Sequence, residues 1–497
     1  MNAAHNANVQ PQASTFQPAS APIAPKPWQS EPATCPWPVL RFDDPKEAFQ
    51  AKSTRQLLQS LAVFQTCACR PFVDNAGWLL PACRRTARPV VDWAVRHTFF
   101  KHFCAGECVD SIRPTVAYLA ANGIRPILQY AAEDNVRDDA ADSTDMAAVA
   151  EAAERACDCN LAIFMRSVRD SDNVASTAIV AIKVTALAPP ALLERASAAL
   201  AGMQAPEDRG ALSARLQEAL APHLTPAEQA SLDKCVRRLD ALATAVQAKG
   251  NARMMVDAEH SHFQPAIDAL ALRLQRRHNR AAPVIFNTYQ CYLKDTAARL
   301  DADIARAARE GWKFGAKAVR GAYLVFERAH AAALGADSPV QDTLEATHAN
   351  YDRCVERVLR VVADGGGELM VASHNQASVA AAAAAMQRLG LHPATSGVYF
   401  GQLLGMADHL SFTLGRSGFR AHKILPYGPV PETLQYLLRR AQENSDFAGG
   451  CAKEVRMIRA ELGRRWRERW GVARVWPGDA AGGDCQAPAP TLSASQS

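Results

Sequence analysis

Polar side chains gather at the ends of short apolar segments, where together they could bind a charged ligand. Lys183 lies in the alternating run Ala181–Thr185, so its side chain is expected to point away from that of Ile182. Asp257 and Glu259 close the run Met254–Glu259. The same arrangement recurs along the chain, at Asn287 and Gln290, at Lys317 and Arg320, and at His374 and Asn375. Each could be a helix cap or a structural ion pair, but their joint occurrence favours a polar site.

Two adjacent arginines add a strong anion-binding signal. Arg439 and Arg440 stand in a helix-prone stretch, and Glu443 follows one turn later. With Lys183 they would form a pocket of three cations, and the planar fork of arginine suits a carboxylate. Taken alone, the two arginines are better explained by an ordinary solvated helix face with an ion pair, because such pairs are common on surfaces. Gly321, in Val319-Arg-Gly-Ala-Tyr323, would let the backbone approach a ligand closely.

The elements that must position these residues alternate between strand and helix. Stretches such as Thr296–Glu310 and Gln376–Leu389 are rich in helix formers and contain few breakers. Eight segments read as strands: Ile124–Tyr130, Ala178–Leu187, Met254–Glu259, Val284–Gln290, Phe314–Tyr323, Leu369–His374, Val398–Leu403 and Ala421–Tyr427. This alternation predicts an α/β chain with a distorted (β/α)8 barrel, an N-terminal helical region and disordered termini. Barrel enzymes place their sites at the strand ends named above.

Composition fixes the remaining organisation. The chain has 497 residues and a net charge of +5, which gives no general case for nucleic acid. We expect a disordered segment over 1–38, a helical region over 39–122, the barrel over 123–450, an amphipathic helix over 451–476 and a disordered tail over 477–497. The first segment has no arginine and no apolar run long enough for a secretory signal or a membrane span, which leaves targeting open. Glu133–Asp145 is acidic and is expected on the surface.

The 13 cysteines include no paired CxxC units, which indicates free thiols in a reducing compartment. A zinc site at His102, Cys104 and Cys108 is the alternative, but structural zinc needs four ligands at tighter spacing. We therefore expect no metal.

The last apolar pattern of the chain allows two interpretations. It consists of Val455, Ile458, Leu462, Trp466 and Trp470, on a helix crowded with arginine. It favours docking on the chain's own domain over contact with an anionic membrane.

Several long motifs, in order, resemble the proline dehydrogenase family, and most closely its eukaryotic mitochondrial form. They are Met255-Val-Asp-Ala-Glu259, Phe286-Asn-Thr-Tyr-Gln-Cys-Tyr-Leu-Lys-Asp295, Val319-Arg-Gly-Ala-Tyr323, Ala372-Ser-His-Asn375, Tyr399-Phe-Gly-Gln-Leu-Leu-Gly-Met406, Tyr427-Gly-Pro-Val430 and Leu438-Arg-Arg-Ala-Gln-Glu-Asn444. The resemblance runs from about Phe42 to about Asn444. It implies FAD at the strand ends, in keeping with the absence of a GxGxxG motif.

The resemblance also implies oxidation of L-proline to 1-pyrroline-5-carboxylate, with electrons passed to a membrane quinone in mitochondria. The residues it implies for the substrate site are Lys183, Arg439 and Arg440 as the carboxylate clamp, Asp257, Tyr323 and Leu403 around the substrate, and Glu443 behind the arginines. Those it implies for FAD are Asn287, Lys317, Val319, Gly321, Ala322 and His374. Some bacterial members carry arginine where Lys317 stands, so a cation is kept.

Substrate choice depends on Ile424. Family members that prefer proline typically carry tyrosine there, and relatives that favour hydroxyproline carry a small polar residue. An apolar isoleucine should suit proline better, because a buried hydroxyl without a partner is penalised. A hydroxyproline dehydrogenase is the alternative within the family. Outside it, Lys183 or Lys317 could serve a Schiff-base aldolase, or the chain could be an interaction protein without a cofactor.

Overall fold

The computed structural model describes residues 37–130, 146–170, 179–203, 209–446 and 450–471. These residues all fall in one compact unit that begins at Trp37. The predicted disorder of 477–497 and the predicted acidic surface segment at 133–145 fall outside the described residues, as does the predicted disorder of 1–38 apart from Trp37 and Pro38.

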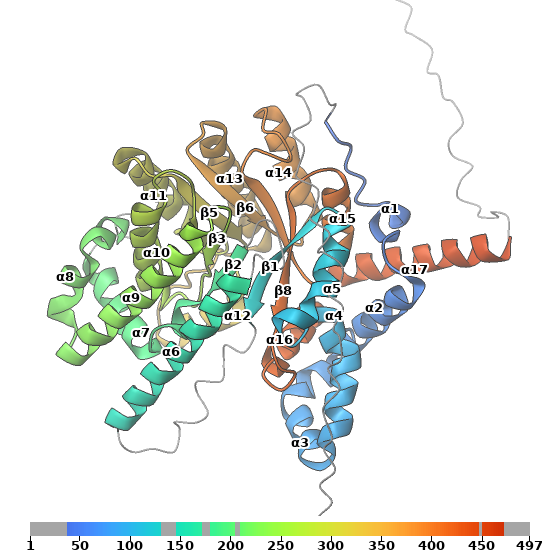
Figure 1. Cartoon of the computed structure of the whole chain (residues 1–497), viewed down its shortest axis with the longest axis horizontal. Helices are drawn as coiled ribbons and strands as arrows, with labels where there is room; N and C mark the ends of the chain where they lie inside the picture. The colour runs from blue at the N-terminus through green and yellow to red at the C-terminus, as the bar shows by residue number, and fades with distance from the viewer. Residues whose placement is uncertain (1–36, 131–145, 171–178, 204–208, 447–449, 472–497) are drawn as a thin grey trace, which may run out of the picture. The chain divides into compact units, whose positions relative to one another are not determined.

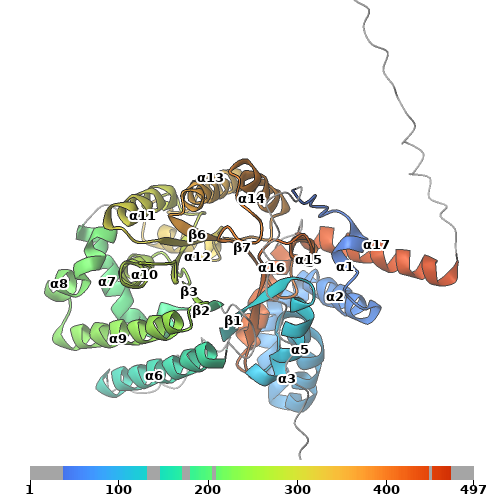
Figure 2. The ribbon, with the colours of Figure 1, turned by 45° about the horizontal axis from the view of Figure 1, so that its top comes forward.

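Eight parallel strands close into a barrel in chain order, which confirms the predicted fold class. Their bounds are Ile124–Tyr130 (β1), Ile179–Ile182 (β2), Arg253–Val256 (β3), Ile285–Gln290 (β4), Phe314–Val319 (β5), Gly367–Ala372 (β6), Val398–Leu403 (β7) and Ala421–Tyr427 (β8). The barrel closes where β1 pairs with β8 along its whole length, from Ile124 beside Ala421 to Tyr130 beside Tyr427. Figure 1 and Figure 2 show the strands inside a ring of helices.

Helices follow the strands, and most of them lie around the barrel (Figure 2). They are α6 (Met146–Asp170), α7 (Pro190–Met203), α8 (Leu216–Leu220), α9 (Pro226–Ala248), α10 (Gln264–His278), α11 (Thr296–Glu310), α12 (Leu324–Ala333), α13 (Leu344–Ala363), α14 (Gln376–Arg388), α15 (Asp408–Arg416) and α16 (Leu434–Asp446). Helix α11 has the bounds that its composition predicts. It ends at Gly311, whose φ of 70° suits glycine because no Cβ meets the following carbonyl.

Alternation along each strand divides its side chains between two apolar clusters. Ile127, Ile179, Met255, Phe286 and Met370 fill the inside of the barrel. Their neighbours in sequence, such as Leu128 and Val180, pack against the helices instead. Because side chains alternate strictly, a residue's parity along its strand decides whether it faces the barrel axis or the helix layer.

Further helices precede and follow the barrel. They are α1 (Pro45–Phe49), α2 (Thr54–Cys67), α3 (Arg70–Val95, with a kink at Ala87), α4 (Lys101–Phe103), α5 (Val109–Ala120) and, at the other end, α17 (Gly450–Trp470). Phe49 and Phe64 of the N-terminal helices form one buried cluster with Met457 and Ile458 of α17. The predicted docking of the last helix is therefore found for its first half. Trp466 and Trp470 near its end are 59% and 65% exposed, and Figure 1 shows this end projecting from the body.

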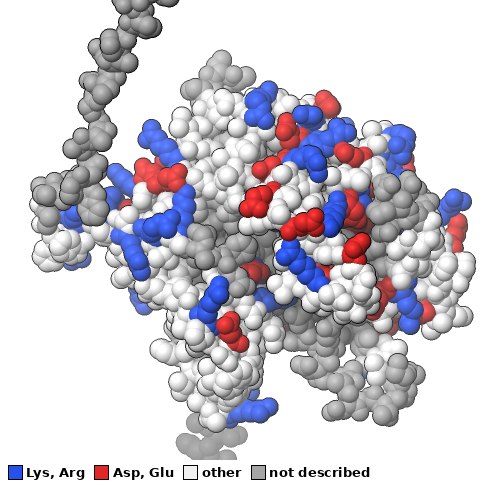
Figure 3. Space-filling model, turned by 180° about the vertical axis from the view of Figure 1, so that it is seen from behind, with Lys and Arg blue, Asp and Glu red and all other residues white. Residues whose placement is uncertain are grey.

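The ten cysteines whose side chains the structure describes are free thiols. Around the zinc alternative, His102 and Cys104 are buried whereas Cys108 is exposed, and no cluster of three His, Cys, Asp or Glu suited to a metal occurs among the residues with described positions. Nor does any described helix have the length and apolarity needed to cross a membrane. Acidic and basic side chains are interspersed on the face seen in Figure 3.

Candidate active site

Strand alternation places most of the predicted site residues on the inner face of the barrel, at one end. Ile179 and Ala181 of β2 point inward, so Lys183, two residues later, continues that face, as predicted. Asp257 follows the inward-facing Met255 of β3 in the same way. Also on this face are Lys317 and Val319 of β5, His374 after β6, Leu403 at the end of β7 and Ile424 of β8.

Asp257 and Lys317 form an ion pair across the mouth of the barrel. The Nζ atom of Lys317 donates to Oδ1 of Asp257 at 2.6 Å, and the two side chains are only 14% and 10% exposed for Asp257 and Lys317 respectively. A charge taken so far out of water is costly unless a partner compensates it. The pair therefore holds both side chains in place and leaves an oriented cation at the cavity wall.

Glu259 is turned away from the mouth by its own hydrogen bonds. Its carboxylate accepts from the Thr185 backbone N–H at 3.1 Å and from the Thr185 hydroxyl, and the residue is 5% exposed. Its backbone carbonyl accepts from Nε2 of Gln290 at 2.7 Å. Burial raises the pKa of Glu259, although the Thr185 bonds and Lys183 act in the opposite direction. Glu259 thus links the loops after β2 and β3 and positions Lys183 rather than meeting a ligand.

Charges from several strand ends act together on Tyr323. Burial raises the pKa of its hydroxyl, while the positive charges of Lys183 and Arg439 lower it. Lys183 directly follows β2 and Arg439 lies in α16, so two of the three cations predicted to bind one anion act on the same hydroxyl. The ring of His260 lies 4.1 Å from that of Tyr323, centroid to centroid, and fixes its orientation from behind.

Helix α16 holds Arg440 by two contacts. Its Nη2 pairs with Glu443, its guanidinium lies 5.2 Å from the centroid of the Tyr436 ring, and the side chain is 12% exposed. Burial raises the pKa of Glu443, although Arg440 and Arg439 lower it. The buried Nε of Arg440 has no hydrogen-bond partner among the described residues. A buried donor left in this way is costly, so the site is suited to a ligand with acceptor oxygens.

His374 fixes the opposite wall. Its Nε2 accepts from the backbone N–H of Leu403 at 3.1 Å. The residue is exposed to solvent, yet desolvation of the ring by the surrounding protein and the charges of Lys423 and Arg440 lower its pKa. It is therefore neutral at physiological pH, with Nε2 as acceptor and Nδ1 as donor.

The turn after β5 depends on a glycine. Gly321 has φ of +134°, and a Cβ there would lie 1.8 Å from Cδ1 of the buried Tyr292. This conformation ends the strand at Val319, four residues before the predicted end at Tyr323. Similarly, β2 ends at Ile182, because Val184–Ala186 forms a 3₁₀ turn. Lys183, Arg320 and Tyr323, which were predicted to lie in strands, thus stand in the loops that follow them.

Two predicted mouth residues point the other way. Asn287 lies on the outer face of β4, with Nδ2 donating to Asp268 of α10 at 3.0 Å and Oδ1 accepting from the Thr288 N–H at 2.9 Å. Arg320 also faces the helix layer, where it donates to Ser373 and Ser378, each at 2.7 Å. Placing them at the mouth was wrong for these side chains. The alternation of side chains along the strands could have predicted this, because Phe286 and Lys317 occupy inner positions and Asn287 and Arg320 are an odd number of residues away from them.

Comparison with known proteins identifies the family. A sequence model described as proline dehydrogenase matches residues 112–453. The chain belongs to the proline dehydrogenase family. It is 34% identical to "Proline dehydrogenase 1, mitochondrial" from Homo sapiens, over 92% of this chain and 94% of that protein. It is 36% identical to "Hydroxyproline dehydrogenase" from Mus musculus, over 88% of this chain and 96% of that one.

Solved structures agree with the fold. The chain is similar to proline utilization A (PutA) from Bdellovibrio bacteriovorus inactivated by N-propargylglycine, with a TM-score of 0.55 at 17% identity. The similarity covers 80% of this chain and 38% of that longer protein. As a member of this family, the chain is an oxidoreductase of proline catabolism.

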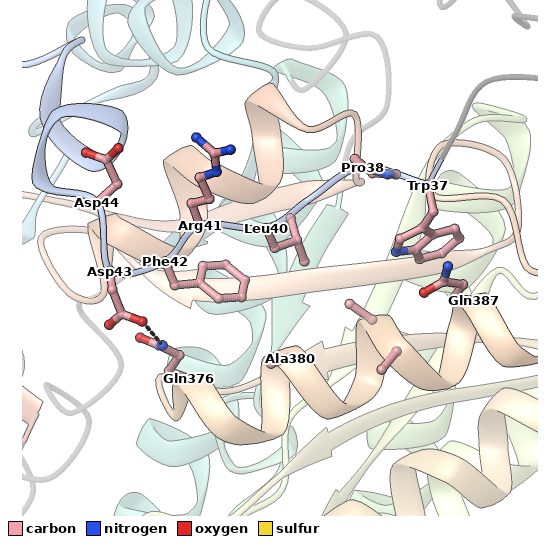
Figure 4. A pocket seen from close by; sticks show the side chains of 12 residues that line it. Trp37, Pro38, Leu40, Arg41, Phe42, Asp43, Asp44, Gln376, Ala380 and Gln387 are labelled. Carbon is pink, nitrogen blue, oxygen red and sulfur yellow. Dashed lines mark hydrogen bonds between the residues drawn. The ribbon is translucent and has the colours of Figure 1, made fainter. Parts of the chain in front are cut away.

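A separate groove lies on the outside of this proline dehydrogenase. It has a volume of about 660 Å³ and runs between residues 37–44 and helix α14. Figure 4 shows Trp37, Leu40 and Phe42 facing this helix, with Gln376 and Gln387 marking its two ends. None of the predicted site residues lines the groove, so it is distinct from the mouth.

Proposed function

We propose that this chain oxidises L-proline to 1-pyrroline-5-carboxylate at the mouth of the barrel, with FAD as resident cofactor and a quinone as electron acceptor. The proposal rests on the cations Lys183 and Arg439, whose charges both act on Tyr323, together with the buried Asp257–Lys317 pair. These cations are suited to hold a carboxylate. Family membership supplies the reaction class.

The cations define how the substrate is held. Lys183, Arg439 and Arg440 bind its carboxylate, and Glu443 keeps Arg440 in place. Three positive charges disfavour a further cation nearby, so they lower the pKa of the substrate amine and help it to become neutral before oxidation. Tyr323 and Leu403 form the walls that fix the ring. Orientation of this kind accounts for much of the rate that an enzyme without a covalent intermediate can gain.

The residues around the mouth fit a flavin. Lys317 supplies an oriented cation, Val319, Gly321 and Ala322 offer a turn with little side-chain bulk, and His374 supplies a neutral ring. Bound there, FAD would supply the acceptor for the two electrons and the hydrogen that leave proline as hydride. Asn287 would act only indirectly, because Asp268 and Thr288 already occupy its amide.

Ile424 favours proline over hydroxyproline. It is partly buried and packs on the interior cluster, beside Leu403 of the neighbouring strand. A hydroxyl placed against this surface would lose its hydration without gaining a partner, at a cost of roughly 1–3 kcal/mol. We therefore expect kcat/KM to be at least about tenfold higher for L-proline than for trans-4-hydroxy-L-proline. A higher value for the hydroxylated substrate would instead assign the chain the activity named for its mouse relative.

We place the enzyme in mitochondria, at the inner membrane or on its matrix side, because its human and bovine relatives are named mitochondrial. The exposed Trp466 and Trp470, among the arginines of α17, are suited to peripheral contact with an anionic membrane. Such contact would bring the enzyme to a quinone dissolved in that membrane.

The decisive experiment is an anaerobic visible spectrum of the purified chain before and after addition of L-proline. Flavin bands that bleach with proline are the expected result. Bands that bleach only with another imino acid would change the substrate. A colourless protein that takes up no added FAD would refute the proposal.

A further inference from the structure

A buried lysine behind the barrel wall supports the loop that follows β7. Lys423 of β8 faces the helix layer and is fully buried. Its Nζ donates to the carbonyls of Leu403, at 2.9 Å, and of Met406. It also pairs with Oδ1 of Asp408 at 2.8 Å. A single cation thus holds both ends of the turn that begins at a predicted substrate-pocket residue.

The same turn is held from outside the barrel. Glu454 of α17 accepts from the backbone N–H groups of Ala407 at 3.0 Å and Asp408 at 3.1 Å. Ala407 has φ of 50°, the left-handed region that a residue with a Cβ rarely adopts, so the local conformation needs outside support. Lys52, between α1 and α2, pairs with the second oxygen of Asp408.

The charges in this cluster balance. Burial alone would raise the pKa of Asp408, but Lys423 and Lys52 outweigh it and hold the pKa below its usual value. Burial and the neighbouring Asp408 raise the pKa of Glu454 to about 7. The nearest other titratable groups, His102 and His409, are kept neutral because burial lowers their pKa values to about 3 and about 4. Two lysines therefore face two carboxyl groups, and removal of one member leaves a buried charge or donor uncompensated.

We propose that Lys52, Asp408, Lys423 and Glu454 form a positioning network for Leu403, through which the terminal helices set the geometry of the substrate pocket. The inference rests on the proposed function of that pocket. Leu403 is fixed at both backbone atoms, because its N–H donates to His374 and its carbonyl accepts from Lys423. Lys52 and Glu454 lie outside the family match, which spans 112–453, so the network adds positioning residues that the match does not include.

Two substitutions at the edge of the network test the proposal on the full-length, FAD-loaded enzyme. Glu454→Ala removes both acceptors of the turn, and Lys52→Met removes one cation of Asp408. Each is expected to lower kcat/KM for L-proline roughly tenfold, mainly through KM, because a small displacement of a pocket wall is amplified in the bound geometry. Lys52→Arg should restore most of the loss. Flavin content per chain should stay unchanged.

A matched control separates positioning from general stability. Glu154→Ala breaks a buried pair between Glu154 of α6 and Arg238 of α9, and should lower the urea midpoint without changing KM. Hydrogen exchange measured by mass spectrometry should become faster over residues 403–411 in Glu454→Ala and Lys52→Met, but not in the control. Unchanged KM and unchanged exchange there, with only a lower midpoint, would overturn the inference. If the wild type fails to oxidise proline, the proposed function fails, and the exchange comparison still decides the role of the network.

Discussion

Asp257→Asn should destabilise the enzyme strongly, because it leaves Lys317 buried with its charge uncompensated. The Lys317 side chain is 10% exposed and its ammonium donates to Asp257 at 2.6 Å. Removal of one partner from a buried pair costs about 3–5 kcal/mol, most of it the penalty of the orphaned charge. We therefore expect the free energy of unfolding to fall by that amount at pH 7.

The double variant Asp257→Asn with Lys317→Met should recover most of the stability. It replaces both charges by neutral groups of similar volume, an exchange that is often neutral in buried pairs. Activity should not recover, because an oriented cation and a carboxylate are both lost from the cavity wall. A double variant that recovers its free energy of unfolding but not its turnover would identify the pair as part of the active site and not only of the fold.

Urea unfolding of the FAD-loaded enzyme, followed by far-UV circular dichroism, gives the four free energies of this cycle. Asp342→Asn is the matched control, since the Lys294–Asp342 pair is 46% and 83% exposed and should contribute less than about 1 kcal/mol. A coupling energy between Asp257 and Lys317 below about 0.5 kcal/mol would refute the reasoning. So would a double variant that oxidises proline at the wild-type rate.

Three further outcomes follow from single features of the structure. Gly321→Ala should cost about 2–5 kcal/mol from backbone strain and a clash with Tyr292, and clearly less in a Tyr292→Ala background; equal costs in urea unfolding would exclude that clash. His422 is fully buried, and burial lowers its pKa to about 3 in the folded state. In the unfolded state the pKa of a histidine is about 6.5, so below that pH the unfolded chain binds more protons than the folded one, and the free energy of unfolding falls on acidification. His422→Gln should remove about 1.4 kcal/mol of that loss per pH unit between pH 6.5 and 5, and an unchanged difference in urea midpoints between pH 7 and 5.5 would contradict it. Replacing Trp466 and Trp470 by serine should weaken co-sedimentation with anionic vesicles at low salt. Equal pelleting of the variant and the wild type would refute the proposed membrane contact. The two substitutions are preferable to deletion of α17, because they leave the hydrogen bonds of Glu454 in place.

Hydrophobic patterning predicts most of the barrel. The segments expected at Ile124–Tyr130, Val398–Leu403 and Ala421–Tyr427 have these same bounds in β1, β7 and β8. The predicted strand bounds are wrong mainly at the ends that lead into the mouth. There the apolar composition continues beyond the last backbone hydrogen bonds of the sheet. At β5 the strand end is set by the φ of Gly321 and by Tyr292 behind it, a contact between residues 29 positions apart. Composition within the segment carries no information about that contact.

The predicted site residues differ in how well the sequence alone could locate their side chains. Lys183 could be assigned from parity alone, since Ala181 and Lys183 share a face. Asn287 was placed at the mouth because it stands near a strand end, and the resemblance assigned it to FAD, but it lies on the outer face, where Asp268 binds it. Glu259 carries the same charge as Asp257 two residues away, yet it is bound by Thr185 from the neighbouring loop. Partners that come from other strands decide which carboxylate stays at the mouth.

The outer face of the strands does as much to shape this site as the inner face. Inward residues such as Asp257 and Leu403 meet the cavity, but their positions depend on polar groups turned toward the helices. Arg320 joins the turn after β5 to Ser373 and Ser378 beyond β6, and Lys423 joins the turn after β7 to Asp408 at the start of α15. A barrel mouth built from eight separate loops has no continuous backbone of its own to hold it in register. Buried cations that donate to several loops at once supply that connection, because each can satisfy carbonyls, hydroxyls and a carboxylate from different elements.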